Sequence, residues 1–351
     1  MATPFFVQAA LMTTRAANSK PDGAPRRPRS RQEALKKLYG LLHFKDRVLI
    51  TIDPDPDAIA SAFALRRLLW RRVQSTTVGI IRPIKRLNNL TMVRLLKLPL
   101  VPIKEKSLAD YDKFLLVDGQ PCHNDIFRKI PYTAVIDHHP LTACSDVPFV
   151  DIRPDYGATS TIFTEYLRAA RIKPSQTLAT ALIYGIKTDT QNFERQSREE
   201  DVRAFHYLFD KINHNVLRKI EISDLALKDL AYFREALENK TVAKDRIYTH
   251  LQKTPSADIL VILADFLLKV HDISWSIVSG IVGNTLVVIV RNDGYRKDAG
   301  KSIQKAFAAF GSAGGHKAAA RAEIPLENLE DVVLRKTPLA YARFVRRRLS
   351  P

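Results

Sequence analysis

Short apolar runs that end in acidic or histidine clusters constrain the fold of this chain more than any other feature. Runs of this length that are rich in Val, Ile and Leu predict buried β-strands, and an amphipathic segment such as Ala58–Arg72 predicts a helix. Because strands alternate with helices, the pattern favours a parallel α/β sheet. The expected strands are Arg47–Ile52, Thr76–Ile81, Phe114–Val117 and Ala134–Ile136.

Three of these runs are followed at once by side chains that can bind cations. Asp53-Pro-Asp-Pro-Asp57 follows the first run, Asp118 the third and Asp137-His-His139 the fourth. Ligands of open α/β sheets bind beyond the carboxyl ends of the strands. We therefore expect one crevice to collect all three clusters.

The chemistry of these clusters indicates a metal site. Asp53, Asp55 and Asp57 would repel one another unless a cation lay between them, although such a triplet on its own is more often a solvated turn. With His138 and His139 beside these carboxylates, a metal site is favoured over a solvated turn. Carboxylates together with imidazole favour manganese, iron or zinc over calcium.

A shared carboxylate and a further acidic position extend the pattern. Two metals about 3.5–4 Å apart need a carboxylate between them, and Asp118, alone at the end of its strand, is placed to be that bridge. A single Asp at such a position is otherwise most often a helix N-cap. Asp189 follows the helix predicted for Gln176–Lys187 and is flanked by two threonines. If it stood alone, it would be interpreted as a capping residue.

A second, smaller α/β domain is expected in the last third of the chain. Alternating charge between 198 and 243 is typical of a helical connector. Beyond it, the expected elements are helices at Ala257–Val270 and Ala299–Phe310 and a hairpin of Trp275–Val282 with Thr285–Arg291. The chain is therefore divided into a disordered basic arm (1–32), a parallel-sheet domain (33–197), a helical connector (198–243) and a second domain (244–345).

The charge of the chain favours polyanionic partners. Its 351 residues include 55 Lys and Arg against 37 Asp and Glu, a formal net charge of +18, which suits nucleic acids, nucleotides or phosphates. Two cysteines are too few for a disulfide framework and fit a reducing compartment. No apolar run approaches the roughly 20 residues that span a membrane. We expect a cytoplasmic protein that makes no membrane contact.

Taken in order, D-x-D-x-D, Asp118, D-H-H, Asp189 and Gly314-Gly-His316 resemble the DHH phosphoesterase superfamily. The resemblance spans about residues 33–340. This superfamily includes the RecJ exonucleases, oligoribonucleases that degrade nanoRNA and dephosphorylate pAp, cyclic-dinucleotide phosphodiesterases and family II pyrophosphatases. The Gly-Gly-His sequence is similar to the DHH-associated substrate-binding domain, which argues against a pyrophosphatase.

The resemblance implies a role for each residue. Asp55 would hold one manganese ion and Asp57 the other, Asp118 would bridge both, and His138 and Asp189 would complete the second site. Asp137 and His139 would be the catalytic pair, with Asp137 behind the ligands and His139 facing the substrate phosphate. Arg291, Gly314, Gly315 and His316 would hold the substrate from the second domain.

One position departs from the family pattern. Oligoribonuclease-like members carry H-x-x-P-D-x-D, and Thr51 stands at the histidine position of this chain. Asp53 restores the D-x-D-x-D form of RecJ-type members, and we include it among the expected metal ligands. The alternative is that Thr51 leaves the first metal weakly held.

The expected activity is hydrolysis of short oligonucleotides (nanoRNA) or pAp by a water that two Mn²⁺ ions activate, with Mg²⁺ as the alternative metal. No oligonucleotide-binding barrel is evident in the sequence, which favours short substrates over long strands. The first alternative is a phosphodiesterase for cyclic or linear dinucleotides. The second is a nucleotide-binding protein whose catalysis has decayed, which Thr51 motivates. A homodimer is left open.

Overall fold

The computed structural model describes residues 30–350 apart from 104, 143–146, 195–196, 296, 332 and 334–335. The described chain forms two compact units. The first runs to Ile84 and from Met92 to Leu217, and the second comprises Lys85–Thr91 and the chain from Arg218 onward. Most of the arm predicted for residues 1–32 lies outside the described residues. Arg31 already belongs to a helix, which Ser30 caps by accepting from the Glu33 N–H.

The first unit is built on a six-stranded sheet in which every neighbouring pair is parallel, in the order β3-β2-β1-β4-β5-β6. The chain reverses its direction of winding between β1 and β4, so this pair marks the topological switch point of the sheet. The strands are β1 (Arg47–Ile52), β2 (Ser75–Ile80), β3 (Val101–Pro102), β4 (Lys113–Val117), β5 (Ala134–Asp137) and β6 (Phe149–Ile152).

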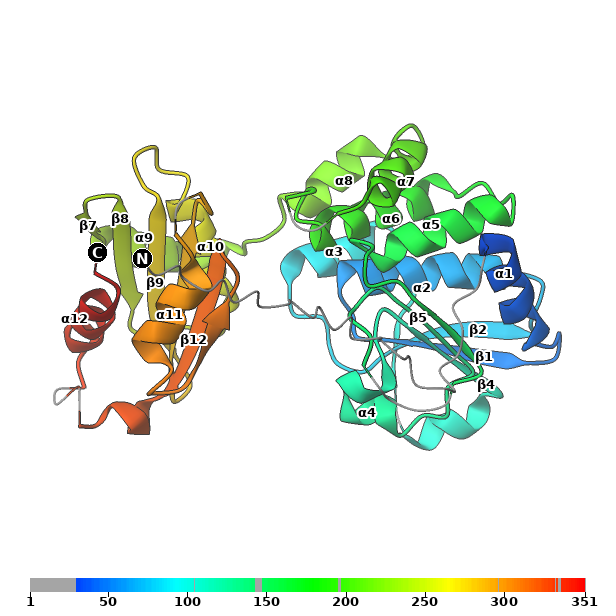
Figure 1. The fold of residues 1–351 in the computed structure, drawn as a ribbon, viewed down its shortest axis with the longest axis horizontal. Coiled ribbons are helices and arrows are strands. Elements are labelled where there is room, and N and C mark those ends of the chain that lie inside the picture. Colours follow the sequence, from blue (N-terminus) through cyan, green and yellow to red (C-terminus); the bar gives the residue numbers. More distant parts are fainter. Residues whose placement is uncertain are drawn as a thin grey trace, which may run out of the picture. The chain divides into compact units, whose positions relative to one another are not determined.

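Helices cover both faces of this sheet. Figure 1 shows α2, α5 and α6 together on one face and α4 on the other. The helix α2 begins at Pro56, a residue that suits the first helical position. Asp55 caps this helix by accepting from the Ala58 N–H. The helices up to residue 221 are α1 (Arg31–Gly40), α2 (Pro56–Leu68), α3 (Leu87–Leu95), α4 (Asp125–Arg128), α5 (Thr159–Ala169), α6 (Gln176–Asp189), α7 (Glu199–Phe209) and α8 (His214–Glu221), with 3₁₀ turns η1 (Glu105–Asp110) and η2 (Pro121–His123).

The segment expected to be a connector is in part anchored to the first unit. Asp201, in the first turn of α7, is fully buried. Its carboxylate accepts hydrogen bonds from the Gly157 N–H (2.9 Å), the Thr161 hydroxyl and the Arg198 N–H (2.7 Å). A buried carboxylate with several donors holds its helix in place. For this reason α7 belongs to the first unit, and the chain passes into the second unit at Arg218.

The second unit carries its own six-stranded sheet, in the order β11-β12-β10-β9-β8-β7. Its pairs are antiparallel except β8 with β9. The strands are β7 (Thr241–Ala243), β8 (Arg246–Leu251), β9 (Trp275–Val282), β10 (Thr285–Asn292), β11 (Ser312–Gly315) and β12 (Ala319–Pro325), and the helices are α9 (Leu230–Glu238), α10 (Asp258–Leu267), α11 (Ala299–Phe307) and α12 (Pro338–Leu349), with 3₁₀ turns η3 (Leu227–Asp229) and η4 (Leu326–Leu329).

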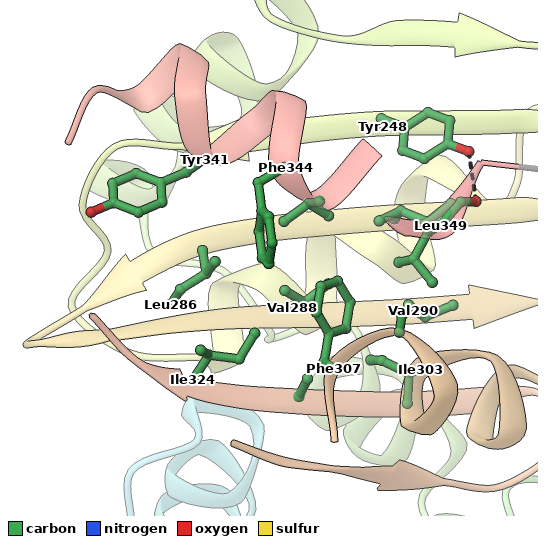
Figure 2. Close-up of a cluster of buried hydrophobic side chains, with 14 of the residues drawn as sticks. Tyr248, Leu286, Val288, Val290, Ile303, Phe307, Ile324, Tyr341, Phe344 and Leu349 are labelled. Atoms are coloured by element: carbon green, nitrogen blue, oxygen red, sulfur yellow. Dashed lines mark hydrogen bonds between the residues drawn. The ribbon is translucent and has the colours of Figure 1, made fainter. Parts of the chain in front are cut away.

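Apolar side chains on both faces of the second sheet form its core. Leu263 and Ala264 of α10 pack on one face against Val278 and Ile289. On the other face, α11 and α12 pack on the strands, and Figure 2 shows Phe307 and Phe344 close to Val288. The mixed α/β architecture predicted from the sequence is thus confirmed in both units. Among the described residues, no helix combines the length and apolar character that crossing a membrane requires.

Candidate metal centre

Adjacent strands of the first sheet end at the same edge, and their last residues gather the candidate ligands. β1 leads into the loop with Asp53, Asp55 and Asp57, β4 into Asp118, and β5 into His138 and His139. Asp189 reaches the same place from the last turn of α6. Asp118 has a backbone φ of 59°, in the left-handed region that residues other than glycine seldom occupy. Strained backbone of this kind is concentrated at functional sites.

Two overlapping groups of side chains are arranged to hold a metal ion. The ligand atoms of Asp57, Asp118, His138 and Asp189 all lie within 4.8 Å of one another, and those of Asp118, His138 and His139 do so as well. The His138 Nε2 lies 3.1 Å from Asp189 Oδ2 and 3.6 Å from Asp118 Oδ1. Asp118 and His138 belong to both groups, so the structure brings the expected bridging carboxylate to the centre of the cluster.

The beginning of α5 orients two buried carboxylates, those of Asp57 and Asp118. The Asp57 carboxylate accepts from the Thr159 N–H over 2.6 Å and from the Ser160 N–H over 2.8 Å. The Thr159 hydroxyl donates to Asp118 Oδ1 over 2.7 Å. Sequence reasoning missed both residues, although Ala158-Thr159-Ser160 at a helix start is the signal that could have found them.

Asp137 and His139 form a hydrogen-bonded pair beside the cluster. The Asp137 carboxylate contacts His139 Nδ1 over 2.8 Å and accepts from the Gln120 amide over 2.7 Å. Burial raises the pKa of Asp137, but the hydrogen bonds from His139 and Gln120 and the charge of His139 together outweigh burial and lower that pKa below its usual value. The hydrogen bond with Asp137 raises the pKa of His139. Gln120, which sequence reasoning missed, therefore supports the Asp137 carboxylate.

Burial and mutual repulsion disfavour the charged form of the clustered carboxyl groups. Burial, together with the charges of Asp189 and Asp57, raises the pKa of Asp55 to about 7. Burial and Asp189 likewise raise that of Asp57 to about 6. The pKa of Asp118 is raised well above its usual value, again mainly by burial and then by Asp57. A cluster of this kind lacks positive charge, which a divalent cation would supply.

The orientation of His138 fits a metal ligand. Its Nδ1 lies 3.1 Å from the Tyr156 carbonyl oxygen, which accepts, so Nδ1 carries a proton. Nε2 is therefore the nitrogen turned toward the carboxylates, and it is buried without a well-formed hydrogen bond to any described residue. Burial lowers the pKa of His138, yet contact with Asp189 and the nearby charges raises it to about 9. One imidazole nitrogen among carboxylates is a donor set that suits manganese, iron or zinc.

Asp53 and Asp55 are not members of the two groups whose ligand atoms could hold a metal ion. Asp53 forms an ion pair with Arg82 beyond β2, and both side chains are partly exposed. Asp55 caps α2 by accepting from the Ala58 N–H over 2.8 Å. Thr51, at the histidine position of the oligoribonuclease pattern, is fully buried and its hydroxyl lies 2.9 Å from the Tyr132 hydroxyl. The structure therefore pairs Asp53 with a cation of the protein and directs Thr51 away from solvent.

The candidate substrate residues lie together at one end of the second sheet. Arg291 of β10 stands opposite Ala319 of β12, and the Ala319 carbonyl accepts from the His316 N–H over 2.8 Å. Gly315 has a φ of 151°, and a Cβ there would lie 2.4 Å from the Ala319 oxygen. This turn therefore requires glycine, and it leaves the His316 side chain exposed. Arg291 forms an ion pair with Asp265 over 2.7 Å.

Comparisons with known proteins found proteins that are similar in sequence and proteins that are similar in fold. An uncharacterized protein of Methanocaldococcus jannaschii is 35% identical over 280 residues, which cover 80% of this chain and 58% of that protein. The chain thus spans 58% of the length of the curated relative that it matches. An exopolyphosphatase-related protein from Bacteroides fragilis has the same fold, with a TM-score of 0.64, 17% identity and coverage of 90% of this chain and 96% of that one.

The model of the DHH family, N-terminal domain, matches residues 47–186. This match begins at the first residue of β1 and contains Asp57, Asp118, His138 and His139. It ends three residues before Asp189. The resemblance inferred from the order of the acidic and histidine residues is confirmed over this range, in which the chain matches the N-terminal domain of the DHH family.

Proposed function

We propose that this protein is a metal-dependent phosphoesterase that hydrolyses short oligonucleotides or pAp and uses Mn²⁺. The observation that carries the proposal is the gathering of the Asp57, Asp118, His138 and Asp189 ligand atoms within 4.8 Å of one another. Two Mn²⁺ ions are proposed on the order of the acidic residues, in which Asp55 would hold one ion, Asp57 the other, and Asp118 both. The +18 net charge is compatible with an anionic substrate.

Bound divalent cations would lower the pKa of a water molecule and neutralise charge on the phosphoryl oxygens. The residues that would hold them are Asp55, Asp57, Asp118, His138 and Asp189, with Asp53 joining if it leaves Arg82. The donors at the start of α5 keep Asp57 and Asp118 aimed at the site. Their hydrogen bonds favour ionised carboxylates, which are the form that binds metal.

His139 is the proposed proton donor toward substrate. Asp137 holds its Nδ1, so the imidazole is fixed in orientation and Nε2 is left for the ligand. The His139 side chain is 43% exposed, more than that of His138 at 13%. Since Asp137 raises the pKa of His139, the imidazole carries a proton more readily near neutral pH. It could therefore donate to a phosphoryl or leaving oxygen.

Arg291, Gly314, Gly315 and His316 are proposed to bind the substrate outside the reacting phosphate. They share one end of the second sheet, where an exposed imidazole and a guanidinium lie on neighbouring backbone segments. Arginine and histidine are suited to a terminal phosphate or a nucleotide. This arrangement supports a substrate that carries a further phosphate or a base, as short nucleotides and pAp do.

The test is a substrate panel with metal-free protein. The protein is stripped with EDTA and assayed with added Mn²⁺ or Mg²⁺ against pAp, RNAs of two to five nucleotides, cyclic dinucleotides and pyrophosphate. We expect hydrolysis of pAp or the short RNAs with Mn²⁺ and a loss of at least about 10³-fold in Asp118→Asn. Asp125→Asn, at an exposed position of α4, is the matched control and should keep full activity. Preferential cleavage of cyclic dinucleotides or pyrophosphate would overturn the substrate assignment.

A further inference from the structure

The turn from Arg153 to Tyr156, which follows β6, contacts Asp137 and His138 at two points. The Arg153 N–H donates to the Asp137 carbonyl over 2.9 Å, so the turn begins beside the residue that precedes His138. The Tyr156 N–H donates to the Arg153 carbonyl over 3.0 Å and closes the turn. The Tyr156 carbonyl then accepts from His138 Nδ1 over 3.1 Å. The orientation of the His138 ring therefore depends on the position of Tyr156.

The Arg153 side chain is buried and paired with two carboxylates. Its Nη2 donates to Asp151 over 2.7 Å and its Nη1 to Glu165 over 2.6 Å. Arg153 is 6% exposed and Glu165 is 8% exposed. The guanidinium carbon also lies 5.1 Å from the centre of the Tyr156 ring, within the range of a cation–π contact. Because a buried charge is costly without its partners, these contacts restrict Arg153, and with it the Tyr156 ring, to one arrangement.

Glu165 connects the Arg153–Tyr156 turn to two helices. It lies on α5, and the Tyr156 hydroxyl donates to its carboxylate, 3.3 Å from each oxygen. The Arg31 guanidinium of α1 donates to the same carboxylate, and Figure 1 shows α1 beside α5. The ion pairs of this network join two positive and two negative side chains, those of Arg31, Arg153, Glu165 and Asp151. Removing the Glu165 charge would leave the buried Arg153 with one carboxylate instead of two, which is costly in the interior.

This network supplies no candidate metal ligand, yet it adjoins one. Among the described residues, neither candidate metal group includes Arg153, Glu165 or Tyr156. The contact with the metal centre is made by the Tyr156 carbonyl, which fixes the proton on His138 Nδ1 and leaves Nε2 toward the carboxylates. A partner that fixes the tautomer and orientation of a metal-binding histidine is usually worth about 10–100-fold in metal affinity. The Tyr156 carbonyl is placed to be such a partner.

We propose that Glu165 is a positioning residue of the metal centre, which acts through Tyr156 on the His138 imidazole. Its carboxylate holds the Tyr156 hydroxyl directly and the Tyr156 ring by way of Arg153. Without these contacts the Arg153–Tyr156 turn can shift, and His138 Nε2 is no longer held in the direction of a metal ion. The inference rests on one part of the proposed function, the binding of divalent cations by the metal centre, and is independent of the substrate.

Titration of the EDTA-treated full chain with Mn²⁺, Zn²⁺ and Mg²⁺ tests the proposal. Tyr156→Phe removes the hydroxyl alone, and Glu165→Gln removes the charge while keeping the shape of the side chain. We expect each substitution to weaken Mn²⁺ and Zn²⁺ binding about tenfold. Mg²⁺ affinity should change less than about threefold, because Mg²⁺ prefers oxygen ligands and depends little on an imidazole. A general loss of structure would instead weaken the binding of all three metals alike.

Tyr132→Phe is the matched control. Tyr132 is also buried in the first unit, and its hydroxyl lies 2.9 Å from that of Thr51, outside the network. The three metal affinities of this variant should equal those of the wild type. In the Tyr156→Phe background, Glu165→Gln should weaken Zn²⁺ binding by less than it does in the wild type, because its effect passes through Tyr156. An equal loss in both backgrounds, equal effects of the two tyrosine variants, or parallel losses of Mg²⁺ and Zn²⁺ would overturn the proposal.

Thermal unfolding shows which metal-free variants are folded, and Tyr156→Phe alone decides the matter if Glu165→Gln does not fold. The two proposals can be told apart by their outcomes. If the wild type binds no divalent cation, both the proposed function and this inference are wrong. If it binds Zn²⁺ and Tyr156→Phe binds Zn²⁺ equally well, only the inference is wrong. If Zn²⁺ binding depends on Tyr156 and Glu165 but no substrate is hydrolysed, the inference holds and the proposed function is wrong.

Discussion

The hydroxyl of Thr159 donates to Oδ1 of Asp118 over 2.7 Å, and so joins the start of α5 to the carboxylate at the centre of the candidate metal groups. Asp118 sits after β4, and Thr159 is 41 residues further along the chain. The orientation of the proposed bridging ligand therefore depends on a helix that contributes no metal ligand of its own.

The contribution of Thr159 can be isolated with an isosteric substitution. Thr159→Val removes the hydroxyl and should weaken Mn²⁺ binding about 10–100-fold, the usual effect of losing a partner that orients a ligand. Thr164→Val is the matched control, since Thr164 on the same helix donates to the Ser160 carbonyl over 2.7 Å and lies outside the metal groups. Metal affinity is measured by titration of the EDTA-treated protein. Equal losses in both variants would show a general effect of destabilising α5.

Close packing of α6 against the site should make Gly185 intolerant of a side chain. A Cβ there would lie 2.5 Å from Ser160 Oγ and 3.0 Å from the Asp57 Cα. We expect Gly185→Ala to lower the free energy of unfolding by about 1–3 kcal/mol. Gly40→Ala, where nothing lies within 4 Å, should change it little. Denaturant unfolding compares the two variants, and similar stabilities would contradict the packing argument.

Stability of the metal-free protein should fall as the pH rises from about 4 to about 9. Burial and neighbouring charge raise the pKa of Asp55 to about 7. Burial lowers the pKa of His138, but the hydrogen bond to Asp189 and the charges of Asp57 and Asp189 together outweigh burial and raise that pKa to about 9. For both groups the folded state binds protons that the unfolded chain has released, above 3.8 for Asp and above 6.5 for His. Both therefore contribute stability at low pH that is lost as the pH rises.

Thermal unfolding in EDTA measures this effect, and Tm should fall by several degrees between pH 5 and pH 9. Added Mn²⁺ should restore more of the Tm at the higher pH, because the carboxylates are then ionised. Asp189→Asn removes one of the charges that raise these pKa values and should flatten the dependence. If Asp189→Asn leaves the dependence of Tm on pH unchanged, groups other than Asp55 and His138 cause that dependence.

The ion pair of Asp53 with Arg82 should compete with metal binding. The side chains are 36% and 58% exposed, and pairs this exposed are worth about 0–1 kcal/mol. Arg82→Gln should therefore tighten Mn²⁺ binding by up to about fivefold if Asp53 is a ligand, as the D-x-D-x-D pattern predicts. Asp53→Asn in the same background should cancel the gain. Arg128→Gln, at an exposed pair on α4, controls for the loss of one positive charge.

Arg291 is expected to act on substrate and not on metal. Arg291→Gln should raise KM at least about tenfold while Mn²⁺ affinity stays at the wild-type value. Arg321→Gln on β12, half-exposed and paired with Glu323, is the control and should leave KM unchanged. A loss of metal in the Arg291 variant would show that the role is wrong.

The gathering of Asp57, Asp118 and His138 could be predicted because each follows a strand, and parallel strands end at one edge of a sheet. The same rule could not place Asp53, since its partner Arg82 follows β2, on the far side of β1 from the other clusters. Short-range sequence patterns carry no information about such an ion pair. The hydrogen bond from Gln120 was missed for the same reason, whereas Thr159 stands at a helix start that the sequence does signal.

Elements with a strong apolar pattern were also predicted more closely than those without one. Arg47–Ile52 and Trp275–Val282 were predicted to the residue, because both are continuous buried runs. Phe149–Ile152 was not predicted, because its buried Asp151 pairs with Arg153 and breaks the apolar pattern. The anchoring of α7 rests on the single buried carboxylate of Asp201, which looks like any other surface charge in the sequence.

The helices α5 and α6 turn opposite ends toward the metal centre, with the start of α5 at Asp57 and the last residue of α6 at Asp189. Aligned peptide dipoles give a helix partial positive charge at its start and partial negative charge at its end. The start of α5 therefore stabilises ionised carboxylates, while the end of α6 attracts a cation. Part of the electrostatic preference for a metal ion thus belongs to the backbone, and amide substitutions of the acidic side chains would leave that part in place.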